Sequence, residues 1–321
     1  MDLVCLGEML IDFFPAEFGR RLAEVSAFIP RPGGAPANVA VAAHRLGSQA
    51  AFIGKVGEDA FGHALAETLR AEGVDISGLR FDRYARTTLA FIAKPDAATS
   101  EYVFYRNPGA DLQLAPQDLD GNLLASTRAL HIGSLSLGAE PARSATHAAV
   151  DRVHAAGGLV SFDVNYRPSL WESPTRALEQ VQAMLPRVDL VKVNEDEACL
   201  LTGSSDPVAA GAELLKAGPS LVILTLGAQG SHYFIAGSQG FIPAFKVQAV
   251  DATGCGDSFI GGLLNRLTQA PGWHSKLTPA DLKQAFRFAS AVGALTATKQ
   301  GAIPAMPTLP DVEAFLAAHP E

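Results

Sequence analysis

Cysteine is scarce in this chain of 321 residues, and its pattern excludes several classes of protein. Cys5, Cys199 and Cys255 are odd in number and none belongs to a CxxC pair, so neither a disulfide framework nor a zinc site is indicated. No stretch approaches the roughly 18 uninterrupted apolar residues of a membrane span. The N-terminus carries an acid where a signal peptide needs basic residues. We therefore expect a soluble, reduced, cytoplasmic protein.

An excess of basic residues is also missing. The chain has 25 Lys and Arg against 33 Asp and Glu, a net charge of −8. Nucleic acids and anionic membranes favour basic stripes, so neither is expected as the main partner. Hydrophobic residues make up 48% and charged residues 18% of the chain, enough for a large core. We expect one domain spanning residues 1–321.

Two common nucleotide-binding motifs are absent. No G-x-x-x-x-G-K-[ST] occurs, which argues against a P-loop NTPase. Gly254-Cys255-Gly256 begins like G-x-G-x-x-G, but Phe259 occupies the place of the third glycine. The segment also lies far from the first βα turn, where a dinucleotide fingerprint belongs. A nucleotide-dependent dehydrogenase is thus an alternative that the glycine spacing disfavours.

What the chain does contain is an alternation of apolar, β-branched runs with helical patterns. Near-continuous apolar runs suit strands buried on both faces of a parallel sheet. Asp206-Pro207 and Thr278-Pro279 are typical helix starts between such runs. The alternation predicts a doubly wound α/β fold with a mostly parallel sheet and helices on both faces. The expected strands are Leu3–Gly7, Ala50–Val56, Ala129–Ile132, Leu159–Asp163, Leu190–Asn194 and Leu221–Leu226.

Two segments break this alternation. Residues 11–32 and 86–108 have β-type patterns with no intervening helix. We expect them to form a small antiparallel sheet that projects from the main layer, as a lid or as a dimer surface.

Residues 251–259 read D-A-T-G-C-G-D-S-F and precede an apolar helical pattern. Gly254, Cys255 and Gly256 leave the backbone unobstructed before a helix that we expect to begin at about Asp257. Unpaired N–H groups and a partial positive charge at a helix start suit phosphate. Asp257 has two readings at this stage: a helix cap, or a general base facing the bound anion.

A second special turn lies in R-P-G-G-A-P-A-N (31–38). Gly33-Gly34 permits backbone conformations closed to other residues, and Pro36 can open a helix whose first turn presents Asn38. Alone, this is equally well a helix start with a glycine hinge.

Together these segments resemble the two signature regions of the PfkB carbohydrate kinase family, which has the ribokinase-like fold. The pieces that carry the resemblance run in order along the chain: G-G-A-P-A-N-V-A, F-I-G-K-V-G-E-D-A-F-G (52–62), K-V-N-E-D-E (192–197), T-L-G-A-Q-G (225–230), D-A-T-G-C-G-D-S-F and T-K-Q-G-A-I-P (298–304).

The resemblance implies an ATP-dependent phosphoryl transfer to a sugar. Asp257 matches the general base, and Gly254, Cys255 and Gly256 match the anion hole. Asn194 and Glu197 match a motif that organises Mg²⁺ and phosphate through water, and Lys192 is expected to reach the ATP phosphates. Thr225, Gly227, Gly230 and Ser290 match the ATP-binding turn and adenine site, and Asp251, Thr253, Thr296, Lys299 and Gly301 match a K⁺ site.

The acceptor residues implied by the resemblance are Asp12, Gly33, Gly34 and Asn38, with Arg106, Asn165 and Arg167. F-Y-R-N-P-G-A-D (104–111) resembles a fructokinase segment and would bring Arg106 from the lid onto the sugar. D-V-N-Y-R-P-S-L-W (163–171) is shared with 2-keto-3-deoxygluconate kinases, where the arginine can bind a substrate carboxylate.

We therefore expect an ATP-dependent fructokinase that makes fructose 6-phosphate. A 2-keto-3-deoxygluconate kinase is the alternative within this class, and a non-catalytic sugar-sensing relative is the alternative outside it. The presence of Asp257 disfavours the sensor, since a protein that has lost catalysis does not need the base.

Overall fold

The computed structural model describes residues 1–96, 101–269 and 278–320. Its main layer is a nine-stranded sheet in the order β13-β12-β11-β10-β9-β8-β1-β4-β5. The strands from β11 to β5 are parallel, and β12 and β13 add an antiparallel edge. The doubly wound, mostly parallel fold expected from the sequence is confirmed.

All six expected strands belong to this sheet. They are β1 (Leu3–Leu6), β4 (Ala50–Gly57), β8 (Ala129–Gly133), β9 (Leu159–Asp163), β10 (Leu190–Asn194) and β11 (Leu221–Thr225). Three further strands were not predicted: β5 (Asp75–Asp82), β12 (Gly230–Ile235) and β13 (Ser238–Pro243). These form the two edges, where partial exposure interrupts the continuous apolar pattern of a central strand.

Alternate side chains of each central strand enter separate cores. Leu3 and Cys5 of β1 belong to one hydrophobic cluster and Val4 to the other, as the period of two in a strand requires. The first cluster includes residues of α1 (Ala35–Arg45), α2 (Ala60–Ala71), α8 (Cys255–Gln269) and α10 (Pro279–Ala297). The second includes residues of α3 (Gly121–Ser126), α4 (Ala142–Ala155), α5 (Pro174–Met184), α6 (Glu195–Thr202) and α7 (Pro207–Leu214). The C-terminal α11 (Leu309–Ala318) packs on α10.

The helix starts follow the sequence signals, with one shift. Asp206 caps α7 by accepting a hydrogen bond from the Val208 amide at 2.9 Å, and Thr278 caps α10 through a capping box with Asp281. The helix expected to begin at about Asp257 begins two residues earlier, at Cys255. Asp257 is therefore inside the first turn of α8 and does not precede it.

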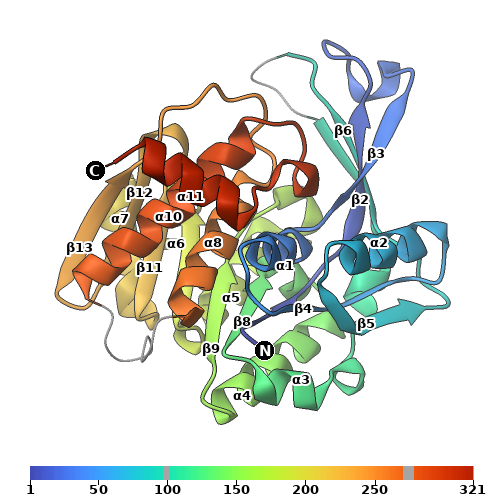
Figure 1. Ribbon diagram of the computed structural model, residues 1–321. Coiled ribbons are helices and arrows are strands. Elements are labelled where there is room, and N and C mark those ends of the chain that lie inside the picture. Colours follow the sequence, from blue (N-terminus) through green and yellow to red (C-terminus); the bar gives the residue numbers. More distant parts are fainter. Residues whose placement is uncertain (97–100, 270–277, 321) are drawn as a thin grey trace.

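The two irregular segments form a separate four-stranded sheet, in the order β3-β2-β6-β7. Its strands are β2 (Leu10–Pro15), β3 (Phe28–Gly33), β6 (Leu89–Ala93) and β7 (Glu101–Tyr105). The outer pairs are antiparallel as expected, whereas β2 and β6 run parallel. Figure 1 shows this small sheet projecting beyond the main layer above α2. Among the helices of the described residues, none has the length and hydropathy needed to cross a membrane.

Candidate active site

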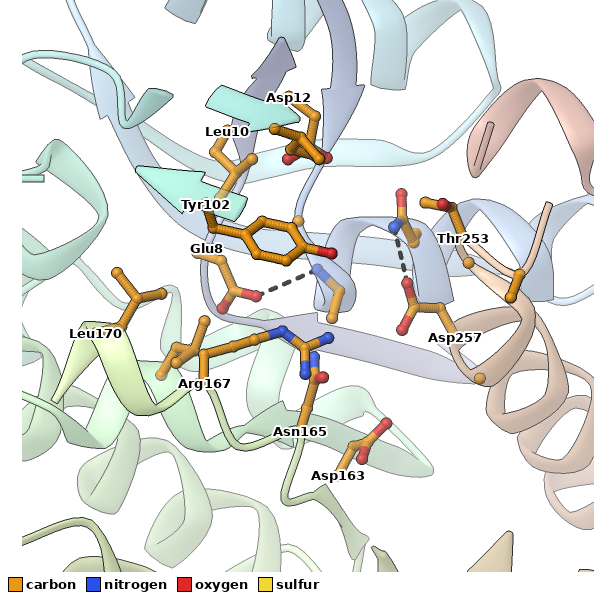
Figure 2. A pocket seen from close by; sticks show the side chains of 18 of the residues that line it. Glu8, Leu10, Asp12, Tyr102, Asp163, Asn165, Arg167, Leu170, Thr253 and Asp257 are labelled. Carbon is orange, nitrogen blue, oxygen red and sulfur yellow. Dashed lines mark hydrogen bonds between the residues drawn. The ribbon is translucent and has the colours of Figure 1, made fainter. Parts of the chain in front are cut away.

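A cavity of about 480 Å³ lies where the small sheet meets the carboxyl edge of the main sheet. Ligands of open α/β sheets characteristically bind at this edge. The lining includes residues from β2, β7, the start of α1, the segment after β9 and the start of α8. Figure 2 shows Asp12, Arg167 and Asp257 around one shared space, although they come from three distant parts of the chain.

Asp257 faces this space. Its Oδ2 accepts a hydrogen bond of 2.8 Å from Nδ2 of Asn38, which is in the first turn of α1. Gly254 and Gly256 line the same cavity, and Gly254 has a φ of +77° that favours glycine. Amides in the first turn of a helix lack helical acceptors, and at the start of α8 the Cys255 amide donates to the Ala252 carbonyl at 3.2 Å. The Asp257 side chain therefore lines the same cavity as Gly254 and Gly256.

Opposing effects act on the pKa of Asp257. Burial raises the pKa of Asp257 to about 6, the Asn38 hydrogen bond opposes that rise, and the Asp163 carboxylate adds to it. Lys192 and Arg167 lower the same pKa. Asp257 is therefore mostly ionised at neutral pH, with a proton affinity well above that of an exposed aspartate.

The expected acceptor residues of the N-terminal segment converge on this cavity. Asp12, on β2, lines it together with Gly34 and Asn38. Burial, and then the charge of Asp257, raise the pKa of Asp12 to about 7. Gly33 lies directly against Asp12, since a Cβ there would be 2.1 Å from Asp12 Oδ2. Glycine at this position leaves room for the carboxylate.

Asn165 and Arg167 reach the cavity from the segment that follows β9. Both side chains line it, and the backbone of Asn165 has a positive φ of 39°. Such a conformation is uncommon for a non-glycine residue, although asparagine is among those that adopt it most readily. The turn allows both side chains to lie beside the cavity (Figure 2).

Lys192 is held in a buried ion pair that the sequence analysis did not anticipate. Its Nζ lies 2.8 Å and 3.0 Å from the two carboxylate oxygens of Asp163 at the end of β9. Both residues line the cavity, and a Cβ at Gly256 would lie 3.5 Å from Nζ. The ammonium group is thus next to the start of α8. The parallel pairing of β9 with β10 places Asp163 opposite Lys192.

Asn194 and Glu197 form a capping box at the start of α6. Asn194 Oδ1 accepts from the Glu197 amide at 2.8 Å, and Glu197 Oε2 accepts from the Asn194 amide at 2.9 Å. The other Glu197 oxygen accepts from the Tyr166 amide at 2.7 Å. Each oxygen of Glu197 therefore accepts a backbone amide, which holds the carboxylate at the start of α6.

Of the residues expected to bind the nucleotide, Lys192 lines the cavity, whereas Asn194, Thr225, Gly227, Gly230 and Ser290 do not. Asn194 and Thr225 are register partners at the ends of β10 and β11. Gly227 and Gly230 follow with φ values of +54° and +133°. Ser290 is buried in α10.

Two of the residues expected at the K⁺ site, Thr253 and Gly301, contact Asp251. Its Oδ1 accepts from Thr253 Oγ1 at 2.8 Å, and its Oδ2 accepts from the Gly301 amide at 3.0 Å. The Lys299 amide donates to the Thr296 carbonyl at 3.3 Å. No group of three or more His, Cys, Asp or Glu suited to a metal occurs in the described part of the chain.

Arg106 lies elsewhere than the sequence analysis expected. Its Nε donates to Asp111 Oδ2 at 2.8 Å, and its guanidinium also donates to the Leu135 carbonyl at 3.3 Å. The side chain is buried and is not among the residues that line the cavity. The residues of the small sheet and its connections that do line it include Lys94, Tyr102 and Phe104.

Sequence reasoning also missed Glu8 and Asp163. Both are acidic residues at the carboxyl end of a buried strand. Glu8 follows β1, and Asp163 is the last residue of β9. That position, at the functional edge of a parallel sheet, was the available signal.

Comparison with known proteins gives a consistent result. The model of the pfkB family carbohydrate kinases matches residues 1–309. The probable fructokinase-2 of Arabidopsis thaliana is 45% identical over 318 residues, covering 98% of this chain and 95% of that protein. The crystal structure of a fructokinase with bound ATP from Xylella fastidiosa has a TM-score of 0.89 at 33% identity, covering 100% and 99% of the two chains. A fructokinase double mutant from Vibrio cholerae O395, in fructose, ADP and potassium ion bound form, has a TM-score of 0.86 at 34% identity, covering 98% of each chain.

Proposed function

Because the chain belongs to the PfkB family of carbohydrate kinases, we propose that it transfers the γ-phosphoryl group of ATP to the 6-hydroxyl of D-fructose. The observation that carries this proposal is the position of Asp257, whose carboxylate faces the same cavity as the start of α8. Its fructokinase relatives support fructose as the acceptor.

In the proposed reaction, Asp257 accepts the proton of the 6-hydroxyl as that oxygen attacks the γ-phosphorus. The amides of Gly254, Cys255 and Gly256 donate to the oxygens of the transferring group, where negative charge is redistributed. The bond to the bridging oxygen of ADP breaks as the bond to the sugar oxygen forms. Asn38 holds the Asp257 carboxylate in place through the bond of 2.8 Å.

Lys192 acts on the phosphate side of this reaction. Its pairing with Asp163 fixes the ammonium group near Gly256. A positive charge there attracts the γ-phosphate and stabilises the departing ADP. Thr225, Gly227, Gly230 and Ser290 are proposed to hold the rest of the nucleotide.

Two cations are proposed to assist. Mg²⁺ would neutralise phosphate charge and would be held through water next to Asn194 and Glu197. The two carboxylate oxygens of Glu197 already accept hydrogen bonds from two backbone amides. K⁺ would lie beside Asp251, supported by the carbonyls around Thr296, Lys299 and Gly301. The occupied Asp251 oxygens fix the carboxylate for that purpose.

The small sheet is proposed to act as the lid and as a homodimer surface. It contributes Asp12, Tyr102 and Phe104 to the cavity. Elsewhere it exposes Val103 and Tyr105, which a second copy could cover.

A substrate panel tests the acceptor. ADP release is measured with fructose, 2-keto-3-deoxygluconate, ribose and adenosine, and turnover is expected on fructose. Turnover on 2-keto-3-deoxygluconate alone would show that the acceptor is this sugar acid and not fructose. Arg167 lines the cavity and could bind the carboxylate of such an acceptor. Binding of fructose with no turnover on any acceptor would favour the sugar sensor.

A further inference from the structure

One acidic side chain at the cavity wall has no part in the reaction described above. Glu8 follows β1, lines the cavity and is only 4% exposed. Its Oε1 accepts a hydrogen bond of 3.2 Å from the Ala35 amide at the start of α1. Its Oε2 is buried and has no hydrogen-bond partner among the residues that the structure describes.

An oxygen in that state indicates a missing partner. Buried polar atoms are nearly always hydrogen-bonded, because leaving them unpaired forfeits their hydration. Glu8 lines the cavity, so a rotation of its side chain would bring Oε2 to a donor on a molecule bound there. A sugar hydroxyl is such a donor.

The position of Glu8 selects which hydroxyl this is. Figure 2 shows Glu8 with Leu170 at one end of the cavity and Asp257 with Thr253 at the other. A fructose whose 6-hydroxyl lies at Asp257 directs C1 and C2 toward Glu8.

We propose that Glu8 is a substrate-binding residue whose Oε2 accepts a hydrogen bond from the hydroxyl on C1 or C2 of the sugar. This inference rests on the proposed function for the identity of the acceptor and the position of its reacting hydroxyl. It adds a contact at the end of the sugar away from the transferred phosphate.

The buried pair behind Glu8 supports this role. Arg106 is bound to Asp111, whose Oδ1 also accepts from Thr88 Oγ1. Burial raises the pKa of Glu8 to about 7, and Asp111 adds to the rise, while the backbone amide of Glu8, the nearby Arg106 and the Ala35 amide lower it. A sugar hydroxyl donated to Oε2 would stabilise the carboxylate further. Arg106, which does not line the cavity itself, would thus affect the sugar through Glu8.

A purely structural role makes a different prediction. The bond from Ala35 to Oε1 holds the start of α1, and losing it would disturb Gly34 and Asn38 whatever sugar is bound. Such damage lowers activity on every acceptor by the same factor. A direct contact instead makes the effect depend on one hydroxyl.

The test compares fructose with 1-deoxy-D-fructose and 2,5-anhydro-D-mannitol, which lack the C1 and C2 hydroxyls respectively. In the wild type, loss of the contacted hydroxyl should lower kcat/KM about tenfold or more, as for a hydrogen bond to a charged group. In Glu8→Ala, loss of the same hydroxyl should lower kcat/KM by less than about threefold. Leu170→Ala, at the same end of the cavity, should keep the full wild-type penalty.

Glu8→Gln keeps an acceptor for Ala35 and covers the case in which Glu8→Ala does not fold. Its second amide atom can donate but not accept, so the penalty should again fall while the melting temperature stays near that of the wild type. Equal penalties in the wild type and the Glu8 variants, for both analogues, would overturn the inference. That result leaves wild-type turnover of fructose intact, whereas failure of the proposed function abolishes it.

Discussion

The substitution Asp257→Asn should stabilise the unliganded protein while it removes activity. Burial raises the pKa of Asp257 from the ordinary 3.8 to about 6, so folding disfavours the ionised form. One pKa unit corresponds to about 1.4 kcal/mol, which gives an upper limit of about 3 kcal/mol at pH 8. Screening in the cavity reduces this figure to roughly 2 kcal/mol. The new amide oxygen can still accept from Asn38.

The sign of the pH dependence follows from the direction of the pKa change. A carboxyl group whose pKa is raised by folding destabilises the native state above that pKa, and the cost disappears as the pH falls toward the unfolded value. The increase in the free energy of unfolding from Asp257→Asn should therefore be complete at pH 8 and about half as large at pH 5. For a chain of this length, roughly 2 kcal/mol corresponds to about 3 °C in melting temperature.

The assay is thermal and urea unfolding of both proteins at pH 8 and pH 5, with kcat measured in parallel. Turnover should fall by about 10²- to 10⁴-fold, as for loss of a general base. Asp196→Asn, which removes the same charge from an exposed position on α6, should change stability by less than about 0.5 kcal/mol. A less stable Asp257→Asn at pH 8, or a gain that does not change with pH, would refute the reasoning.

Three further outcomes are expected. A pH profile of kcat/KM should fall on the acid side below about pH 7, because burial raises the pKa of Asp12 to about 7 and that of Asp257 to about 6; a flat profile down to pH 5 contradicts it. Lys192→Met should destabilise the fold by about 3–5 kcal/mol in urea unfolding, because Asp163 stays buried without its partner. Adding Asp163→Asn should restore most of that stability but not the activity. Gly34→Ala should lower the free energy of unfolding by about 1–3 kcal/mol, because φ is +108° and a Cβ would lie 2.5 Å from a backbone carbonyl oxygen. It should also weaken sugar binding measured by calorimetry, and unchanged binding contradicts this.

The central strands could be predicted because burial on both faces leaves a continuous apolar run, as in Val4 and its neighbours. The edge strand β5 has only two buried residues, and the other six are exposed or partly buried, so no such run exists there. Hairpin β12–β13 lies at the other edge and was missed for the same reason. Local composition therefore identifies the middle of this sheet better than its margins.

Within the site, local motifs predicted some of the residues that line the cavity, among them Asp12, Asn38 and Asp257, but not how charges pair. The Asp163–Lys192 contact depends on the register of two strands 29 residues apart in the chain. Arg106 was expected on the sugar because its motif resembles a fructokinase segment, yet Asp111, five residues on, binds it instead. Pairing of buried charges is decided by tertiary packing, which a short motif does not contain.

The bond between Asn38 and Asp257 joins residues 219 positions apart, with a consequence for protein synthesis. During translation, much of the cavity wall has left the ribosome before the residue that completes it. A product truncated before α8 would keep Asp12, Gly34 and Arg167 but lack the carboxylate that pairs with Asn38. Premature termination or proteolysis between Asn38 and Asp257 should therefore yield inactive fragments, and co-expressing the two pieces should restore activity only if they reassociate around this bond.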